Sequence, residues 1–106
     1  MPRDVLLTTD EHDALERLGR RVRLARLRRN LTQEDLAERA GTTRKTVRAL
    51  EQGRETVSVG LLLKVMTILG YPDRLPALLE SDPIGEDLEE VHGRKRAGGV
   101  SGVADF

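Results

Sequence analysis

The sequence contains no cysteine and almost no aromatic residues. Its 106 residues include one tyrosine, one phenylalanine and no tryptophan. Without cysteine, the chain can form neither a disulfide framework nor a thiolate metal site. No stretch approaches the roughly 18 apolar residues that a membrane-spanning helix needs, and the first residues do not resemble a secretory signal peptide. These absences are typical of a small soluble domain, which we expect to be cytoplasmic.

The chain also lacks a net charge, but this balance hides two regions of opposite sign. Residues 17–54 contain twelve basic and four acidic side chains, a net charge of +8, whereas residues 81–106 carry −3. Eleven of the twelve basic residues are arginines, whose planar guanidinium group suits phosphates and guanine edges. The basic region therefore indicates a polyanionic partner, although an arginine-rich helix face exposed to water would have the same composition.

Apolar residues recur every three or four positions through the first eighty residues, and no sustained alternation indicates strands. This periodicity predicts an all-α fold. Five helices are expected, at about residues 10–30, 33–40, 44–52, 59–69 and 72–80.

Several of these helices have recognisable ends. Thr32, Thr43 and Ser58 are suitable N-caps, and Asp35 follows Thr32 at the spacing of a capping box. Gly41 can adopt the left-handed conformation that closes a helix. These local features predict where the second, third and fourth helices begin.

After residue 80 the composition changes. Residues 81–106 contain five of the ten glycines and many charged residues. Such a segment buries too little apolar surface to offset the conformational entropy lost on folding. We therefore expect a helical domain at residues 10–80 and a flexible, largely disordered tail at residues 81–106, with a transient helix at residues 86–92.

The connection between the second and third predicted helices is very short. Gly41, Thr42 and Thr43 leave about three residues of turn, which is the spacing of a helix-turn-helix motif whose second helix enters the DNA major groove. Short connections also occur in helical bundles of other function. The third helix, however, begins with basic side chains where base edges would be reached: Arg44, Lys45 and Arg48.

Residues 31–53, LTQEDLAERAGTTRKTVRALEQG, resemble the Cro/CI (Xre-type) helix-turn-helix family of phage repressors and bacterial regulators. The resemblance covers about residues 18–70 and implies five short α-helices that bind DNA. It makes Arg44 and Lys45 base readers. Ala49 departs from the polar residue of some members, so either Arg48 takes part of that role or fewer bases are read. Arginine paired with guanine O6 and N7 is the contact that geometry favours.

The same resemblance implies residues that position the DNA and the recognition helix. Gln33 is similar to a glutamine that bridges a backbone phosphate and the recognition helix, and Thr43 and Thr46 look like phosphate contacts. Arg26 and Glu51 would form a partly buried ion pair. The alternative is that Arg26 faces a phosphate.

A single short recognition helix offers a small interface, so we expect a homodimer on an inverted-repeat operator. Leu75, Leu78 and Leu79 on the last predicted helix are the expected dimer interface. Leu75 has an alternative role, because it could instead pack against the first helix.

The segment from Asp82-Pro-Ile to Gly-Arg-Lys-Arg at residues 93–96 looks like the HipB-like antitoxins of type II toxin–antitoxin modules. This likeness implies a repressor that controls its own operon and binds a HipA-like kinase toxin. Phe106 would then anchor the tail to the partner, or else simply end a disordered terminus. The alternative function is a stand-alone Xre-type transcriptional regulator with no toxin partner.

Catalysis and metal binding have little support in the sequence. His12 and His92 stand alone, with no second ligand at the spacing that metal sites use. Glu89 and Glu90 lie in the predicted tail, where burial could not raise a carboxyl pKa. We therefore expect no enzyme activity, no metal and no cofactor.

Overall fold

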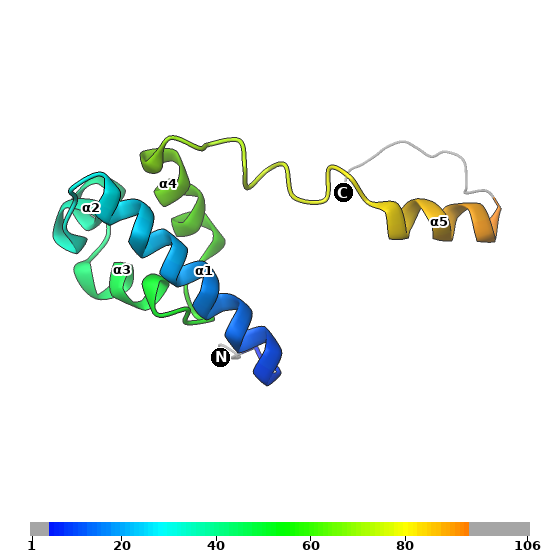
Figure 1. Ribbon diagram of the computed structural model, residues 1–106, viewed down its shortest axis with the longest axis horizontal. Coiled ribbons are helices and arrows are strands. Elements are labelled where there is room, and N and C mark those ends of the chain that lie inside the picture. Colours follow the sequence, from blue (N-terminus) through cyan, green and yellow to red (C-terminus); the bar gives the residue numbers. More distant parts are fainter. Residues whose placement is uncertain (1–4, 94–106) are drawn as a thin grey trace. The chain divides into compact units, whose positions relative to one another are not determined.

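A computed structural model describes residues 5–93 of the chain (Figure 1). The described residues form helices and turns without strands, so the predicted all-α class is confirmed. They divide into two compact units, separated after Pro76. The helices are α1 (Thr9–Arg28), α2 (Gln33–Ala40), α3 (Arg44–Glu51), α4 (Val59–Leu69) and α5 (Pro83–His92).

The predicted caps form as expected. Thr32, Thr43 and Ser58 each precede a helix and accept a hydrogen bond from the backbone N–H three residues later. Gly41 closes α2 in the left-handed conformation, with φ of 72°. At α1, the cap is Thr8, which forms a capping box with the third helical residue. Four helices of the first unit therefore begin where side-chain oxygens can satisfy their free N–H groups.

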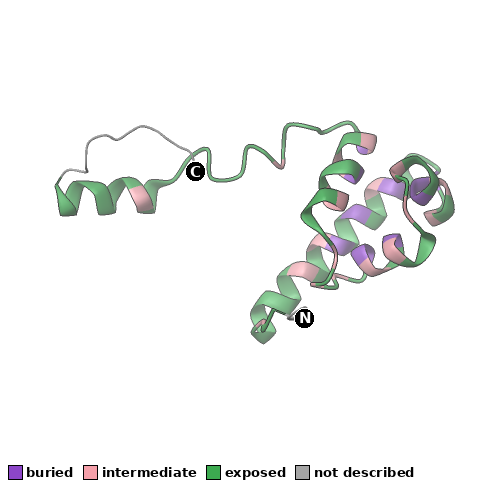
Figure 2. Cartoon of the chain, turned by 180° about the vertical axis from the view of Figure 1, so that it is seen from behind, coloured by how far each residue is buried: buried purple, intermediate pink, exposed green. Residues whose placement is uncertain are grey.

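The core lies entirely in the first unit. Helix α1 packs on α3, and α2 packs on both α3 and α4. Figure 2 shows buried positions on these helices and none on α5. The residues of the buried apolar cluster are Val22, Leu36, Ala37, Val47, Leu50, Val65 and Leu69.

Two glycines allow α1 to approach the end of α3 very closely. A Cβ atom on Gly19 would overlap the carbonyl oxygen of Glu51 and lie 2.7 Å from its carbonyl carbon. Gly53 has φ of 77°, and a Cβ atom there would lie 2.7 Å from the Cα of Glu16. Both positions therefore exclude a side chain, and Gly53 also needs a conformation that glycine adopts readily.

The prediction of a helix at residues 72–80 is wrong. This segment forms successive turns, and Leu79 has a positive φ of 68°. Pro76 explains the difference, because it cannot donate the i→i−4 hydrogen bond that a helix starting at Pro72 would need. The fifth helix is α5, further along the chain, where the Asp82 side chain accepts the N–H of Gly85 at 3.0 Å.

The structure also bears on two expectations for the chain after α4, which are the dimer interface and the flexible tail. Leu78 and Leu79 are exposed and Leu75 is half-buried, but none of them lies on the helix that was expected to form the dimer interface. Within the segment predicted to be a flexible tail, Pro83–His92 is helical. Phe106 lies outside the described residues. In the described part of the chain, no helix is long and apolar enough to cross a membrane.

Candidate nucleic-acid interface

Helix α3 has one face in the core and one face in water. Val47 and Leu50 are buried, whereas Arg44, Lys45 and Arg48 are exposed. This division follows from the helical period, because residues three or four apart share a face. The three side chains predicted to contact bases therefore lie on the accessible side of a helix whose other side is fixed by packing.

The N-terminus of α3 carries the two predicted phosphate contacts. The Thr43 hydroxyl accepts the backbone N–H of Thr46 at 3.2 Å, and the two hydroxyl oxygens lie 2.9 Å apart. Thr43 is exposed and Thr46 is half-buried. A helix N-terminus favours anionic groups because its free N–H groups and its dipole present positive charge. This end of α3 is therefore suited to a phosphate.

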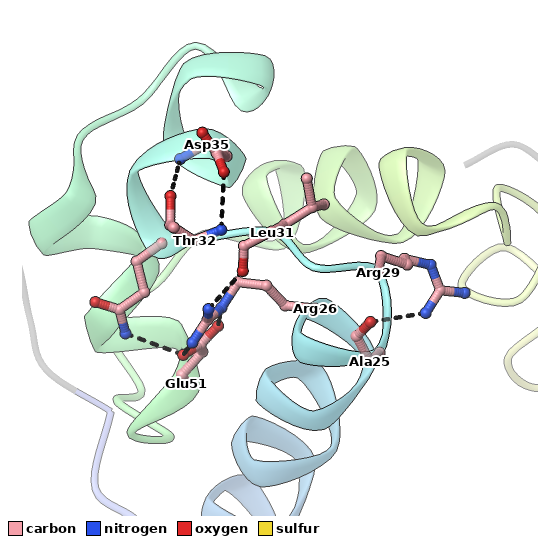
Figure 3. A network of polar contacts seen from close by, with 8 residues as sticks. Ala25, Arg26, Arg29, Leu31, Thr32, Asp35 and Glu51 are labelled. Atoms are coloured by element: carbon pink, nitrogen blue, oxygen red, sulfur yellow. Dashed lines mark hydrogen bonds and ion pairs between the residues drawn. The ribbon is translucent and has the colours of Figure 1, made fainter.

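Arg26 and Glu51 form the ion pair that the resemblance implied (Figure 3). Nε of Arg26 donates to Oε2 of Glu51 at 2.6 Å, and Nη2 donates to Oε1 at 3.0 Å. Nη1 donates to the carbonyl oxygen of Leu31 at 2.8 Å. The side chains are only 6% and 3% exposed, so Arg26 does not face solvent or a phosphate.

Gln33 joins this network and contacts the recognition helix, which is one half of the bridge that the resemblance implied. Its Nε2 donates to Oε1 of Glu51 at 3.0 Å. Gln33 begins α2 and Glu51 ends α3, so the bond links the two helices of the motif. It uses one N–H of the side-chain amide and leaves the second for another acceptor, such as the phosphate oxygen that the resemblance implied.

The beginning of α2 is reinforced by a reciprocal pair of hydrogen bonds. The Asp35 carboxylate accepts the Thr32 N–H at 3.0 Å, and the Thr32 hydroxyl accepts the Asp35 N–H at 2.9 Å. The backbone N–H of Thr32 and then its hydroxyl hold the pKa of Asp35 below its usual value. The hydrogen bonds between Thr32 and Asp35 therefore stabilise the helical turn that carries Gln33.

A shallow hollow of about 290 Å³ brings together the starts of α2 and α3. Its lining includes Thr32, Gln33 and Arg44. The predicted phosphate contact on α2 and the predicted base reader on α3 therefore open onto the same surface. A residue predicted to bind a phosphate and a residue predicted to read a base thus share one surface of the helix-turn-helix motif.

Not every arginine of the basic region is available for a partner. Arg29 donates to the carbonyl oxygens of Ala25 at 2.7 Å and Leu69 at 2.9 Å, which connects the ends of α1 and α4. Figure 3 shows the bond to Ala25. Like Arg26, this residue has a structural role. The interpretation of the arginines as a solvent- or polyanion-facing surface therefore applies to neither Arg26 nor Arg29.

Gln52 is a candidate contact that sequence reasoning missed. It caps the C-terminus of α3 and is exposed. It lies four residues after Arg48, which places it on the same face of the helix. This spacing was readable from the sequence, and it extends the exposed polar face by one helical turn.

Comparison with known proteins identifies the family. Residues 17–79 match a family described as Helix-turn-helix domain. The chain belongs to this helix-turn-helix family. An uncharacterised HTH-type transcriptional regulator of Methanothermobacter thermautotrophicus is 47% identical over 49 residues, which cover 46% of this chain and 71% of the relative.

A second relative matches a segment of similar length. An uncharacterised HTH-type transcriptional regulator of Methanocaldococcus jannaschii is 44% identical over 41 residues, which cover 39% of this chain and 62% of the relative. These matches support the helix-turn-helix part of the predicted resemblance. In the described residues of this helix-turn-helix protein, no group of three or more His, Cys, Asp or Glu side chains could hold a metal ion.

Proposed function

We propose that this helix-turn-helix protein is a sequence-specific DNA-binding transcriptional repressor with α3 in the major groove. The observation that carries the proposal is the exposed row of Arg44, Lys45 and Arg48 on a helix whose opposite face is buried. Arginine can make two hydrogen bonds to guanine O6 and N7, which distinguishes guanine from the other bases. The names of both relatives as transcriptional regulators support the same function.

Base readers and phosphate contacts should behave differently when they are removed. Contacts to phosphates position a protein on DNA, whereas contacts to base edges select the sequence. We assign base contacts to Arg44, Lys45 and Arg48, and phosphate contacts to Gln33, Thr43 and Thr46. Gln33 begins α2 and the two threonines lie in or next to the first turn of α3, where a helix end favours anionic groups. Arg44 and Lys45 share that turn of α3 and are assigned to bases because arginine and lysine pair with guanine O6 and N7.

The experiment uses duplexes selected by the protein from a random-sequence library. Arg44→Ala should weaken binding to the best duplex by roughly 1–3 kcal/mol and relax one base position. Gln33→Ala should weaken binding to all sequences more evenly. Arg39→Ala, at the opposite end of α2 from Gln33, is the matched control. It should change neither the affinity for the best duplex nor the base preference.

The salt dependence and the selectivity of Arg44→Ala decide the outcome. Binding should fall steeply with salt, because arginines displace counterions from the phosphates. If Arg44→Ala bound with weaker affinity but unchanged base preference at every position, α3 would not be the reading helix. If no duplex were enriched over random DNA, the protein would not be a sequence-specific repressor.

We also propose that the protein acts as a homodimer on an inverted repeat. One α3 of eight residues contacts few base pairs, and dimeric helix-turn-helix proteins read two half-sites about one helical turn, roughly 34 Å, apart. Leu75, Leu78 and Leu79 remain part of the proposed interface, although they lie on turns. Sedimentation should show a dimer at micromolar concentration, and a half-site should bind more weakly than a full site.

The proposed biological role is an antitoxin that represses its own operon and binds a HipA-like kinase toxin in the cytoplasm. Its support is the likeness of the segment around residues 82–96 to HipB-like antitoxins. A stand-alone regulator accounts for the DNA-binding domain equally well.

The full chain should retain a HipA-like kinase from a lysate of the source cells. A chain ending at residue 102 should lose part of that binding if Phe106 anchors the partner. Absence of such a kinase would favour the stand-alone regulator.

A further inference from the structure

Helix α5 is regular and yet has no buried residue. It has ten residues, and isolated helices shorter than about 12–15 residues are only marginally stable in water. Ile84, Leu88 and Val91 lie at helical spacing on one face and are 76%, 52% and 76% exposed. A helix of this kind gains stability when its apolar face packs against another surface.

The charge of α5 restricts the chemistry of that surface. Four of its ten residues are acidic and none is lysine or arginine. Asp87 borders the apolar face, because it lies one position before Leu88 and three after Ile84. The acidic side chains would repel an acidic surface and also DNA. The surface that covers α5 should therefore offer both exposed apolar groups and positive charge.

The outer face of α1 has this chemistry. Arg17, Arg20, Arg21, Leu24 and Arg28 follow one another at helical spacing and are all exposed. They lie on the side of α1 opposite the buried Val22 and Arg26. A shallow hollow of about 280 Å³ is lined by the first three arginines and Leu24.

We propose that α5 of one copy packs on the outer face of α1 of a second copy, and that the two copies exchange this contact reciprocally. The apolar face of α5 covers Leu24, and Asp87 lies toward Arg21. The exchange produces two identical contacts related by a two-fold axis, which closes the assembly as a dimer. The inference rests on the dimer of the proposed function and adds a second pair of surfaces to its interface, beside the turns that carry Leu75, Leu78 and Leu79.

A DNA duplex is the other occupant that the arginines of α1 would accept. The exposed Leu24 among them favours a protein helix, because phosphates gain nothing from an apolar neighbour. DNA also leaves the apolar face of α5 exposed, whereas the reciprocal contact covers that face and the face of α1 at once. If α1 instead holds a second duplex, one dimer will retain two labelled duplexes and Arg21→Glu will abolish this without changing the sedimentation of the free protein.

The first experiment compares two changes on opposite sides of α5 in the full chain. Ile84→Ser combined with Leu88→Ser should raise the dimer dissociation constant at least tenfold in sedimentation equilibrium. Glu86→Ser, on the side of the helix away from Leu88, is the matched control and should shift it less than twofold. Equal dimerisation of the double variant and the wild type would overturn the proposal.

The second experiment exchanges charges between copies. Arg21→Glu alone and Asp87→Arg alone each place like charges at both contacts, so each variant should be mainly monomeric. A mixture of the two variants should form heterodimers, because Glu at position 21 then meets Arg at position 87, and Arg21 meets Asp87. Failure to form heterodimers would overturn the proposal, including the case in which α5 folds back within its own chain.

DNA binding separates this inference from the proposed function. Ile84→Ser with Leu88→Ser should bind an isolated selected half-site within twofold of wild type and should lose affinity only for the full inverted repeat. If selection of DNA sequences fails in the wild type while the heterodimers form, the proposed function is wrong and the dimer surface stands. If half-site binding persists but heterodimers do not form, the dimer surface is wrong.

Discussion

The two ends of α3 are built in opposite ways. The N-terminal end carries Arg44 and Lys45 in water, and the Thr43 cap and the buried Val47 hold it in place. The C-terminal end is buried, and Glu51 there receives hydrogen bonds from α1 and from the start of α2. One helix thus has an accessible end and an anchored end.

This difference shows how a short helix can present long side chains in a defined place. Eight residues are too few for a stable helix on their own, so the orientation of α3 must come from its contacts. The ion pair, the close approach at Gly19 and the buried Leu50 all act on its last turns. Fixing that end leaves the first turn accessible without leaving it free to tilt. Preorganisation of this kind favours precise recognition.

The largest effect should come from breaking the anchored end. Glu51→Ala leaves the Arg26 guanidinium buried without its carboxylate, which should lower the free energy of unfolding by roughly 3–5 kcal/mol. Arg26→Met combined with Glu51→Leu should recover much of this loss, because no unpaired charge remains. Glu38→Ala on the exposed side of α2 is the control. Denaturant unfolding measures all three, and a Glu51→Ala variant as stable as wild type would contradict the role of the pair.

The close contact between α1 and α3 should be almost as sensitive. Gly19→Ala places a methyl group against the backbone of Glu51, and overpacking of this kind typically costs about 1–3 kcal/mol. Gly60→Ala in α4 is the matched control, because its Cβ atom would find only the Ser58 hydroxyl, at 3.8 Å. Alanine favours helices by about 1 kcal/mol over glycine, so Gly60→Ala should stabilise. Thermal unfolding of both variants checks the opposite signs.

Much of the fold was predictable because its determinants are local. Thr32, Thr43 and Ser58 cap helices through bonds to residues three positions away, so the sequence reveals them directly. The segment after α4 was mispredicted for an equally local reason. Its leucines suggested a helix, but Pro76 blocks one. Asp82 followed by Pro83 is a helix start that composition had obscured.

The site was predictable only in part. The helical period separates Arg44 and Arg48 from the buried residues of α3, and the same rule would have found Gln52. The Gln33–Glu51 bond joins residues 18 positions apart, and spacing along the chain does not reveal such tertiary contacts. The overlap that makes Gly19 necessary likewise depends on how two helices meet. The Arg26–Glu51 pair was expected from family resemblance alone.

At the accessible end of α3, a smaller change in stability should accompany a change in DNA binding. Thr43→Ala removes the cap and should lower the free energy of unfolding by about 1 kcal/mol. It should also weaken binding to all selected duplexes, if Thr43 contacts a phosphate. Thr43→Ser keeps the hydroxyl and should preserve both properties. A Thr43→Ala variant with reduced stability and unchanged DNA affinity would leave Thr43 with a capping role only.

The smallest expected effect is the pH dependence of the Asp35 capping box, which steadies the turn beside the accessible end. Hydrogen bonds from the Thr32 N–H and hydroxyl lower the pKa of Asp35. The folded protein therefore binds this proton less readily than the unfolded chain, in which an aspartate has a pKa of about 3.9. The stabilisation is fully present above that value and is lost as pH falls through the lower pKa of the folded state.

Asp35→Asn keeps an acceptor but not the charge, so its deficit in unfolding free energy should be constant near neutral pH and shrink below about pH 4. Repeating the measurement in 1 M salt, where the Debye length is about 3 Å, should reduce any contribution from the α2 dipole and preserve that of the hydrogen bonds. A deficit that does not change between neutral pH and the acid limit would show that the charge of Asp35 contributes nothing to the capping box.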